Sequence, residues 1–199
     1  MIHLKKVLRH IFRHIRRYET VENGEKVVQN LLAFLGEGKG RTLALYVACD
    51  GEVAVNTLYE PLTANGWRIV LPVVLPVVME KEAPMIFRPW YGEPLNEKDA
   101  MNMPIPSTSG TMASDTTPDT MKIDTMAPDI IVLPLVAFDD TGARLGMGAG
   151  CYDRTLPLYP NVLKVGAAFN KQKFNNLPTQ KHDAFLDVIV TETEVKKFK

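Results

Sequence analysis

Short apolar runs alternate along the chain with stretches of helical periodicity. Unbroken apolar runs are typical of strands covered on both faces, and they lie at 43–48, 68–74, 130–133, 162–169 and 186–190, with a further strand expected at 85–90. Helical patterns lie between them, at 21–35, 53–65 and 152–159. Gly36 and Gly66 follow two of these helices, where a capping glycine is favoured. The alternation predicts an α/β fold, a three-layer α/β/α sandwich with a mainly parallel central sheet.

The first 18 residues carry a separate, basic pattern. Their apolar residues share one helical stripe, no acid is present, and the cations are Lys5, Lys6, Arg9, Arg13, Arg16 and Arg17. Three interpretations remain open at this point. The segment is the solvated basic face of a packed helix, an Arg-rich organelle transit peptide, or a helix that aims a lysine and an arginine at a phosphate.

Composition adds limits to this picture. A chain of 199 residues with 46% hydrophobic and 23% charged residues is typical of a globular protein, and we expect one domain over 1–199. The net charge of zero gives no reason to expect nucleic acid, and no apolar run is long enough to cross a membrane. Two cysteines are too few for a disulfide scaffold, which favours the cytoplasm. Residues 106–128, rich in Ser, Thr, Asp and Pro, predict a mobile surface loop.

The candidate chemistry lies in residues 133–156, where a glycine-rich turn follows a buried strand. Gly146, Gly148 and Gly150 alternate, which lets the backbone turn tightly and approach a ligand closely. Arg144 offers a planar fork for phosphate, and Asp153 can hold a divalent metal. The segment matches neither the P-loop pattern nor the dinucleotide-binding pattern. On these residues alone, a phosphate site and an ordinary turn both remain open.

A resemblance to a known family adds to this reading. The string PLVAFDDTGARLGMGAGCYDRTL at 134–156 closely resembles the central motif of the 5-formyltetrahydrofolate cyclo-ligase family. Four shorter segments resemble other parts of that family in the same order: KKVLR at 5–9, DGEV at 50–53, VGAAFNKQKFNNLP at 165–178 and HDAFLDVIVTE at 182–192. The resemblance covers nearly the whole chain.

The resemblance implies roles for particular residues. It implies ATP binding by two groups, Lys5, Lys6, Val7, Leu8 and Arg9 near the N-terminus and Arg144, Leu145, Gly146, Met147, Gly148, Ala149, Gly150, Cys151 and Tyr152 in the central motif. It implies binding of the reduced folate by Cys49, Glu52, Ala54 and Tyr152, and of Mg²⁺ by Asp153 and Asp187. Arg144 and Lys5 would be the catalytic cations.

The implied reaction joins the formyl carbon of 5-formyltetrahydrofolate to nitrogen-10, giving 5,10-methenyltetrahydrofolate, ADP and phosphate. A formamide oxygen is a poor leaving group, and phosphorylation by ATP makes it a good one. Such a reaction needs positioning and charge neutralisation rather than a side-chain nucleophile. We expect a cytoplasmic monomer whose partners are ATP, Mg²⁺ and the reduced folate, with no nucleic-acid or membrane partner.

The chain departs from the family pattern at four places. Cys151 stands where an aromatic residue is usual, Ala149 where some members have lysine, and Ala54 where an acid is usual. A Pro-Glu-Pro element appears only as Pro-Ile-Pro at 104–106. These departures bear on folate affinity more than on ATP binding.

Two alternatives to a cyclo-ligase follow from the same sequence. One is a sugar-phosphate isomerase or CoA-transferase relative on a similar scaffold, since a fold alone does not define a function. The other is a nucleotide- or folate-binding relative without turnover. The His182–Asp183 pair is interpreted as a loop hydrogen bond rather than a general acid–base unit.

Overall fold

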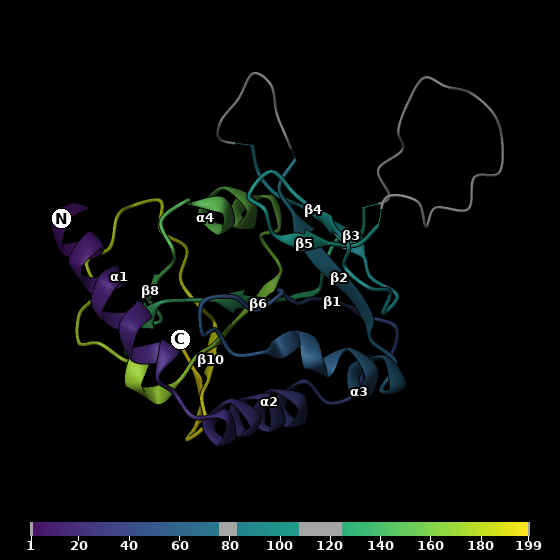
Figure 1. Ribbon diagram of the computed structural model, residues 1–199, viewed down its shortest axis with the longest axis horizontal. Coiled ribbons are helices and arrows are strands. Elements are labelled where there is room, and N and C mark those ends of the chain that lie inside the picture. Colours follow the sequence, from purple (N-terminus) through teal and green to yellow (C-terminus); the bar gives the residue numbers. More distant parts are fainter. Residues whose placement is uncertain (1, 76–82, 108–124, 199) are drawn as a thin grey trace, which may run out of the picture.

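The protein folds around one mixed sheet, shown in Figure 1. The computed structural model describes residues 2–75, 83–107 and 125–198. Within these residues the sheet has seven strands in the order β11-β10-β9-β6-β1-β2-β3. They are β1 (Thr42–Ala44), β2 (Arg68–Val73), β3 (Ile86–Pro89), β6 (Ile130–Pro134), β9 (Leu163–Ala167), β10 (Val188–Val190) and β11 (Val195–Lys197). The five central strands are parallel and both edge strands are antiparallel, which confirms the predicted α/β fold.

Helices cover both faces of this sheet. On one face, α2 (Val21–Leu35), η1 (Val55–Leu58) and α3 (Tyr59–Ala64) share a hydrophobic cluster with Leu43 and Leu45. On the other face, η3 (Leu156–Leu158), which follows α4 (Cys151–Thr155), packs in a second cluster with Ala44. Alternate residues of one strand therefore enter different clusters, as expected for a strand buried on both faces. The arrangement is the predicted three-layer sandwich, with α2 below the sheet and α4 above it in Figure 1.

The predicted helix 21–35 is confirmed, whereas two other helices are shorter than predicted. Thr20 caps α2 by accepting a hydrogen bond from the Asn23 amide, and Gly36 ends it with a positive φ. The segment 53–65 divides into a 3₁₀ turn and α3 because Pro61, which has no N–H, is tolerated only in the first turn of a helix. Pro157 ends α4 in the same way and starts η3.

Helix α1 (Ile2–Arg17) packs onto the domain through one face. Leu8 and Phe12 lie in a third cluster with Val136 and Leu145. Lys5 and Arg16 are also buried on this face. The helix is thus a packed element of the folded domain, as the first interpretation of the basic N-terminus requires, and its buried Lys5 and Arg16 favour the third; both are supported over the transit peptide.

Two small hairpins were not expected from the sequence: β4 (Glu97–Lys98) with β5 (Pro104–Ile105), and β7 (Ala137–Phe138) with β8 (Arg144–Leu145). Asp139 shapes the second hairpin, because its carboxylate accepts hydrogen bonds from the amides of Thr141, Ala143 and Leu177. The first predicted strand also ends early, at Ala44. A 3₁₀ turn, η4 (Asn170–Gln172), follows β9.

Most of the loop predicted at 106–128 lies outside the described residues. In the part of the chain that is described, no helix is both long and apolar enough to cross a membrane.

Candidate active site

A cavity of about 300 Å³ lies at the carboxyl ends of the central strands. Strands β2 and β6 flank β1, so the connections of the sheet diverge there, and such points are where open α/β sheets bind ligands. The cavity wall comes from α1, the residues after β1 and β2, the β4–β5 hairpin, the segment 144–153 and the segment 180–183. Segments far apart in the sequence therefore meet at one place.

The glycine-rich segment forms one wall of the cavity. Gly148 and Gly150 have φ values of +110° and +68°, which side chains rarely adopt. A Cβ atom at Gly148 would also lie 3.2 Å from the guanidinium carbon of Arg9. Arg9 donates from Nε to the carbonyl of Gly146 at 2.9 Å, and Arg154 donates to the carbonyl of Ala149 at 2.9 Å. Two arginines, one from α1 and one from α4, thus bind carbonyl groups of the loop.

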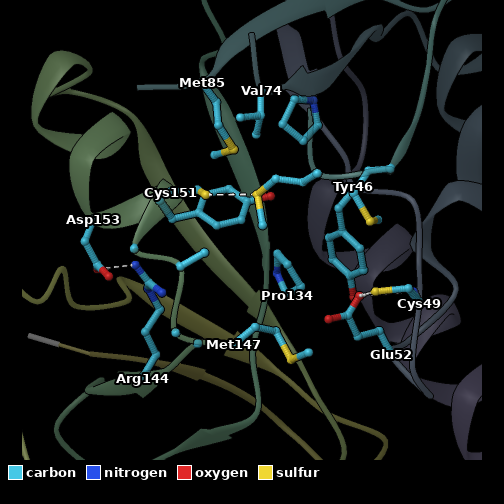
Figure 2. Close-up of a pocket in the computed structure, with 18 of the residues that line it drawn as sticks. Tyr46, Cys49, Glu52, Val74, Met85, Pro134, Arg144, Met147, Cys151 and Asp153 are labelled. Carbon is cyan, nitrogen blue, oxygen red and sulfur yellow. Dashed lines mark hydrogen bonds and ion pairs between the residues drawn. The ribbon is translucent and has the colours of Figure 1, made fainter. Parts of the chain in front are cut away.

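Two further cations line the cavity, and each is held by a carboxylate. Arg144 Nη2 donates to Asp153 Oδ1 at 2.6 Å, as Figure 2 shows. Lys5 Nζ donates to Asp183 Oδ2 at 2.6 Å. Both cations are less than a tenth exposed. The Nε atom of Arg144 is buried and has no hydrogen-bond partner in the described part of the chain, so a donor remains for a ligand.

Four carboxylates line the cavity, those of Glu52, Asp99, Asp153 and Asp183, and two of them, Asp153 and Asp183, pair with the cations Arg144 and Lys5. The Ala184 amide donates to Asp153 Oδ1 at 3.2 Å, which ties the 180–184 segment to α4. Burial acts to raise the pKa of Asp183, but the hydrogen bond and charge of Lys5 and the Gln180 amide lower it below its usual value. Asp183 is therefore an ionised carboxylate at neutral pH.

Asp187 does not join this pair. It stands just before β10, at the amino end of that strand, and accepts from the Lys164 amide at 2.8 Å. Its side chain also pairs with Lys164 Nζ at 2.9 Å and lines a separate surface pocket. The cavity lies at the opposite, carboxyl edge of the sheet. The structure thus does not bring Asp187 together with Asp153, the other predicted metal ligand, and places Asp183 in the cavity instead.

No cluster of three or more His, Cys, Asp or Glu side chains suited to a metal occurs among the described residues.

The far end of the cavity contains Glu52 and its neighbours. Burial raises the pKa of Glu52, and the charge of Arg16 opposes this rise. Arg16 lies fully buried behind Glu52, with Nη1 3.4 Å from the carboxylate. The Cys49 amide donates to Glu52 at 3.1 Å, and partial burial with the nearby carboxylate raises the pKa of Cys49 to about 11. Cys49 therefore stays a thiol and is not a nucleophile at neutral pH.

The predicted ligand-binding residues divide into two sets. The cavity brings together Lys5, Arg9, Cys49, Glu52 and every residue from Arg144 to Tyr152, together with Asp153. The others lie elsewhere, because Lys6 and Val7 are on the exposed face of α1, Leu8 is in the core, and Ala54 is exposed at the start of η1. Lys5 and Arg9 are four residues apart and so share one helical face.

Several residues that line the cavity were not predicted from the sequence. Met85, Met101 and Met103 form an apolar wall, and the Met101 sulfur lies 3.5 Å from the Cys151 sulfur. Tyr46 is buried just after β1. None of these positions has a distinctive sequence pattern. For Asp183 a signal was present, since it lies within the HDAFLDVIVTE motif.

The fold and the site define a ligand-binding α/β domain. Its cavity lies where the connections of the sheet diverge and contains a glycine-rich loop beside several cations. A sequence model of the 5-formyltetrahydrofolate cyclo-ligase family matches residues 2–192. The chain belongs to this family, whose members named below are ligases.

Individual relatives align with this chain over most of their length. The chain is 30% identical to a 5-formyltetrahydrofolate cyclo-ligase of Haemophilus influenzae, over 83% of this chain and 84% of that one. It is 28% identical to the cyclo-ligase of Escherichia coli, over 87% and 90% of the two chains. The solved structure of a 5,10-methenyltetrahydrofolate synthetase from Aquifex aeolicus superposes with a TM-score of 0.73 at 29% identity, over 98% of this chain and 93% of that one.

Proposed function

We propose that this enzyme uses ATP to cyclise 5-formyltetrahydrofolate to 5,10-methenyltetrahydrofolate, releasing ADP and phosphate. Family membership supports the reaction class. The observation that carries the ATP dependence is the meeting of Lys5, Arg9 and Arg144 with the glycine loop in one cavity. Three cations at a tight, open backbone turn suit a polyphosphate.

The triphosphate would lie along the wall formed by residues 144–150. Arg144 has the geometry for this role, because its buried Nε donor is unpaired among the described residues and its guanidinium is already oriented by Asp153. Lys5 is a second buried donor group that lines the same cavity. Cations held in place before the reaction neutralise developing charge without reorganisation.

Magnesium would be held by Asp153 and Asp183. Mg²⁺ is commonly bound by one or two carboxylates together with substrate phosphates and water, and Asp153 and Asp183 are the cavity carboxylates that lie beside Arg144 and Lys5. The bound ion would supply charge neutralisation between phosphate oxygens. Asp153 and Asp183 would exchange Arg144 and Lys5 for the metal, and the two cations would then be free to donate to phosphate.

The reduced folate would occupy the other end of the cavity. Met85, Met101 and Met103 line the cavity, with Met101 beside Cys151, and offer an adaptable apolar surface for the folate. Glu52 offers a carboxylate that accepts hydrogen bonds from a pterin N–H edge. For the reaction, the formyl group on nitrogen-5 would have to face the nucleotide along the glycine loop.

The reaction then proceeds by substrate groups that the protein positions. The formyl oxygen attacks the γ-phosphorus and ADP leaves. Nitrogen-10 attacks the activated formyl carbon and loses its proton to solvent, and phosphate departs with the former formyl oxygen. Arg144 and Lys5 neutralise charge on the transferred phosphoryl group, and no residue forms a covalent bond to substrate.

A direct assay tests the proposal. The purified protein is mixed with 5-formyltetrahydrofolate and Mg-ATP, and the methenyl product is followed by its absorbance. We expect product only when ATP and magnesium are both present, and ADP in equal amount. Product formation without ATP, or at the same rate in excess chelator, would contradict the proposal. Lys5→Ala should lower the rate of product formation, because it removes a cation proposed to neutralise the transferred phosphoryl group. Lys6→Ala is its matched control, because Lys6 is the adjacent lysine on the exposed face of the helix.

A further inference from the structure

The hydroxyl of Tyr46 is a buried polar group without a partner. Tyr46 is only 3% exposed, and its Oη atom is shielded from solvent with no hydrogen-bond partner among the described residues. A buried hydroxyl that makes no hydrogen bond destabilises a fold, and most buried polar groups in proteins are paired. The described residues offer this hydroxyl no partner, so a bound molecule is the natural source of one.

The surroundings of this hydroxyl point to a ligand. Tyr46 lines the cavity directly after β1, at the carboxyl edge of the sheet. Figure 2 shows its ring directed toward the Glu52 carboxylate at the end of the cavity opposite Arg144 and Asp153. The ring itself belongs to the core cluster beneath α2 and α3, so the hydroxyl is held in place by packing.

The protonation state of this group suits a donor. Burial raises the pKa of Tyr46 well above its usual value, and the negative charge of Glu52 acts in the same direction. The phenol therefore keeps its proton at neutral pH. In its ionised form Glu52 is a hydrogen-bond acceptor only.

We propose that Tyr46 is a substrate-positioning residue whose hydroxyl donates a hydrogen bond to the ring carbonyl of the pterin, while Glu52 accepts hydrogen bonds from the adjacent N–H groups. This inference rests on the proposed function for the identity of the ligand. The 2-amino-4-oxo edge of a reduced pterin carries one carbonyl acceptor next to a ring N–H and an amino group. A phenol donor beside a carboxylate acceptor complements that order, and a site that hydrogen-bonds such an edge discriminates against rings that lack it.

Tyr46→Phe tests the role because it removes one oxygen and keeps the packed ring. We expect the Michaelis constant for 5-formyltetrahydrofolate to rise roughly three- to tenfold, the range for one lost hydrogen bond, with the constant for ATP unchanged within about twofold. The ligand-free variant should melt at the same temperature as wild type or higher, because an unpaired buried hydroxyl has been removed. Tyr59→Phe is the matched control, since Tyr59 packs against the same core cluster and does not line the cavity.

Calorimetric titration with 5-formyltetrahydrofolate alone separates this inference from the proposed function. Weaker binding by Tyr46→Phe than by wild type supports the inference even if wild type makes no methenyl product, in which case only the proposed reaction fails. Unchanged folate affinity in Tyr46→Phe overturns it. A variant that melts several degrees below wild type also overturns it, because the hydroxyl would then have a structural partner, and so does failure of the wild type to bind the folate.

Discussion

Arg16 is a fully buried charged residue, and its replacement by methionine gives a sharp test of the structure. Its side chain has no exposed surface. It donates to the carbonyls of Asp50 at 2.8 Å and Leu135 at 3.1 Å, and it faces the carboxylates of Asp50 and Glu52 at 3.2 and 3.4 Å. Arg16→Met keeps most of the apolar stem and removes every one of these interactions.

The expected cost follows from the charge that is left behind. Glu52 would remain buried without its counter-ion, and breaking a buried ion pair from one side typically costs about 3–5 kcal/mol. In a protein of this size 1 kcal/mol corresponds to about 2–4 °C in melting temperature. We therefore expect the melting temperature at pH 7 to fall by roughly 6–20 °C, together with a lower midpoint in urea.

Arg13→Met is the matched control. Arg13 also pairs with Asp50, at 2.6 Å, but its side chain is 40% exposed. Exposed ion pairs contribute only about 0–1 kcal/mol, so this variant should lose at most a few degrees. Equal losses for the two variants, or a neutral Arg16→Met, would refute the reasoning about burial.

The pH dependence of Arg16→Met provides a second check. Loss of Arg16 removes the influence that opposes the rise in the Glu52 pKa. A carboxyl whose pKa is raised in the folded state stabilises the fold at low pH, and that contribution is lost as pH rises through the folded pKa. The stability deficit of Arg16→Met should therefore shrink from pH 8 to pH 5. Adding Glu52→Gln to Arg16→Met should recover part of the loss at pH 8.

Three further predictions concern the cavity and its supports. Asp183→Asn should lower turnover at least about tenfold, because it removes the proposed metal ligand and the partner of Lys5, whereas Asp187→Asn should stay within about twofold of wild type. Similar turnover in both variants would contradict the proposed placement of the metal. Arg154→Ala should raise the Michaelis constant for ATP roughly two- to tenfold without changing that for the folate, because it frees the Ala149 carbonyl that fixes the glycine loop. The pKa of Asp50 is lowered from 3.8, because the hydrogen bonds from Arg13 and Arg17 outweigh the effect of its burial. The contribution of Asp50 to stability is therefore present above pH 3.8 and is lost as pH falls further. Asp50→Asn should be less stable than wild type at pH 7, and the two should have the same stability in acid unfolding well below pH 3.8.

Much of the fold was predictable because its central strands are covered on both faces. Such strands read as apolar runs, and the runs at 68–74 and 130–133 lie within one residue of β2 and β6. The hairpins β4–β5 and β7–β8 were not predictable, since strands of two residues contain no period to detect. Their formation depends on contacts made elsewhere, such as the bond from the Leu177 amide to Asp139.

The site was predictable where its residues are contiguous and not where they converge from separate segments. Residues 144–153 line the cavity as one stretch. The choice between Asp183 and Asp187 depends on which edge of the sheet each reaches. Asp187 lies within the predicted run 186–190, but the strand begins only at Val188, which places Asp187 at the edge away from the cavity. The missing partner of the Tyr46 hydroxyl is a property of packing, and no sequence pattern reports it.

The pairing of cations and carboxylates explains how so many charges occupy one small cavity. Lys5 with Asp183 and Arg144 with Asp153 form two pairs, each at 2.6 Å, and their formal charges cancel. Burying an unpaired charge would cost a large desolvation free energy. Pairing each cation with a carboxylate reduces this cost. Under the proposed function, a nucleotide that arrives with its metal would bring phosphates for Lys5 and Arg144 and a cation for Asp153 and Asp183. Each side chain then exchanges one ionic partner for another, which lets the protein keep a charged, oriented site without a large energetic penalty in either state.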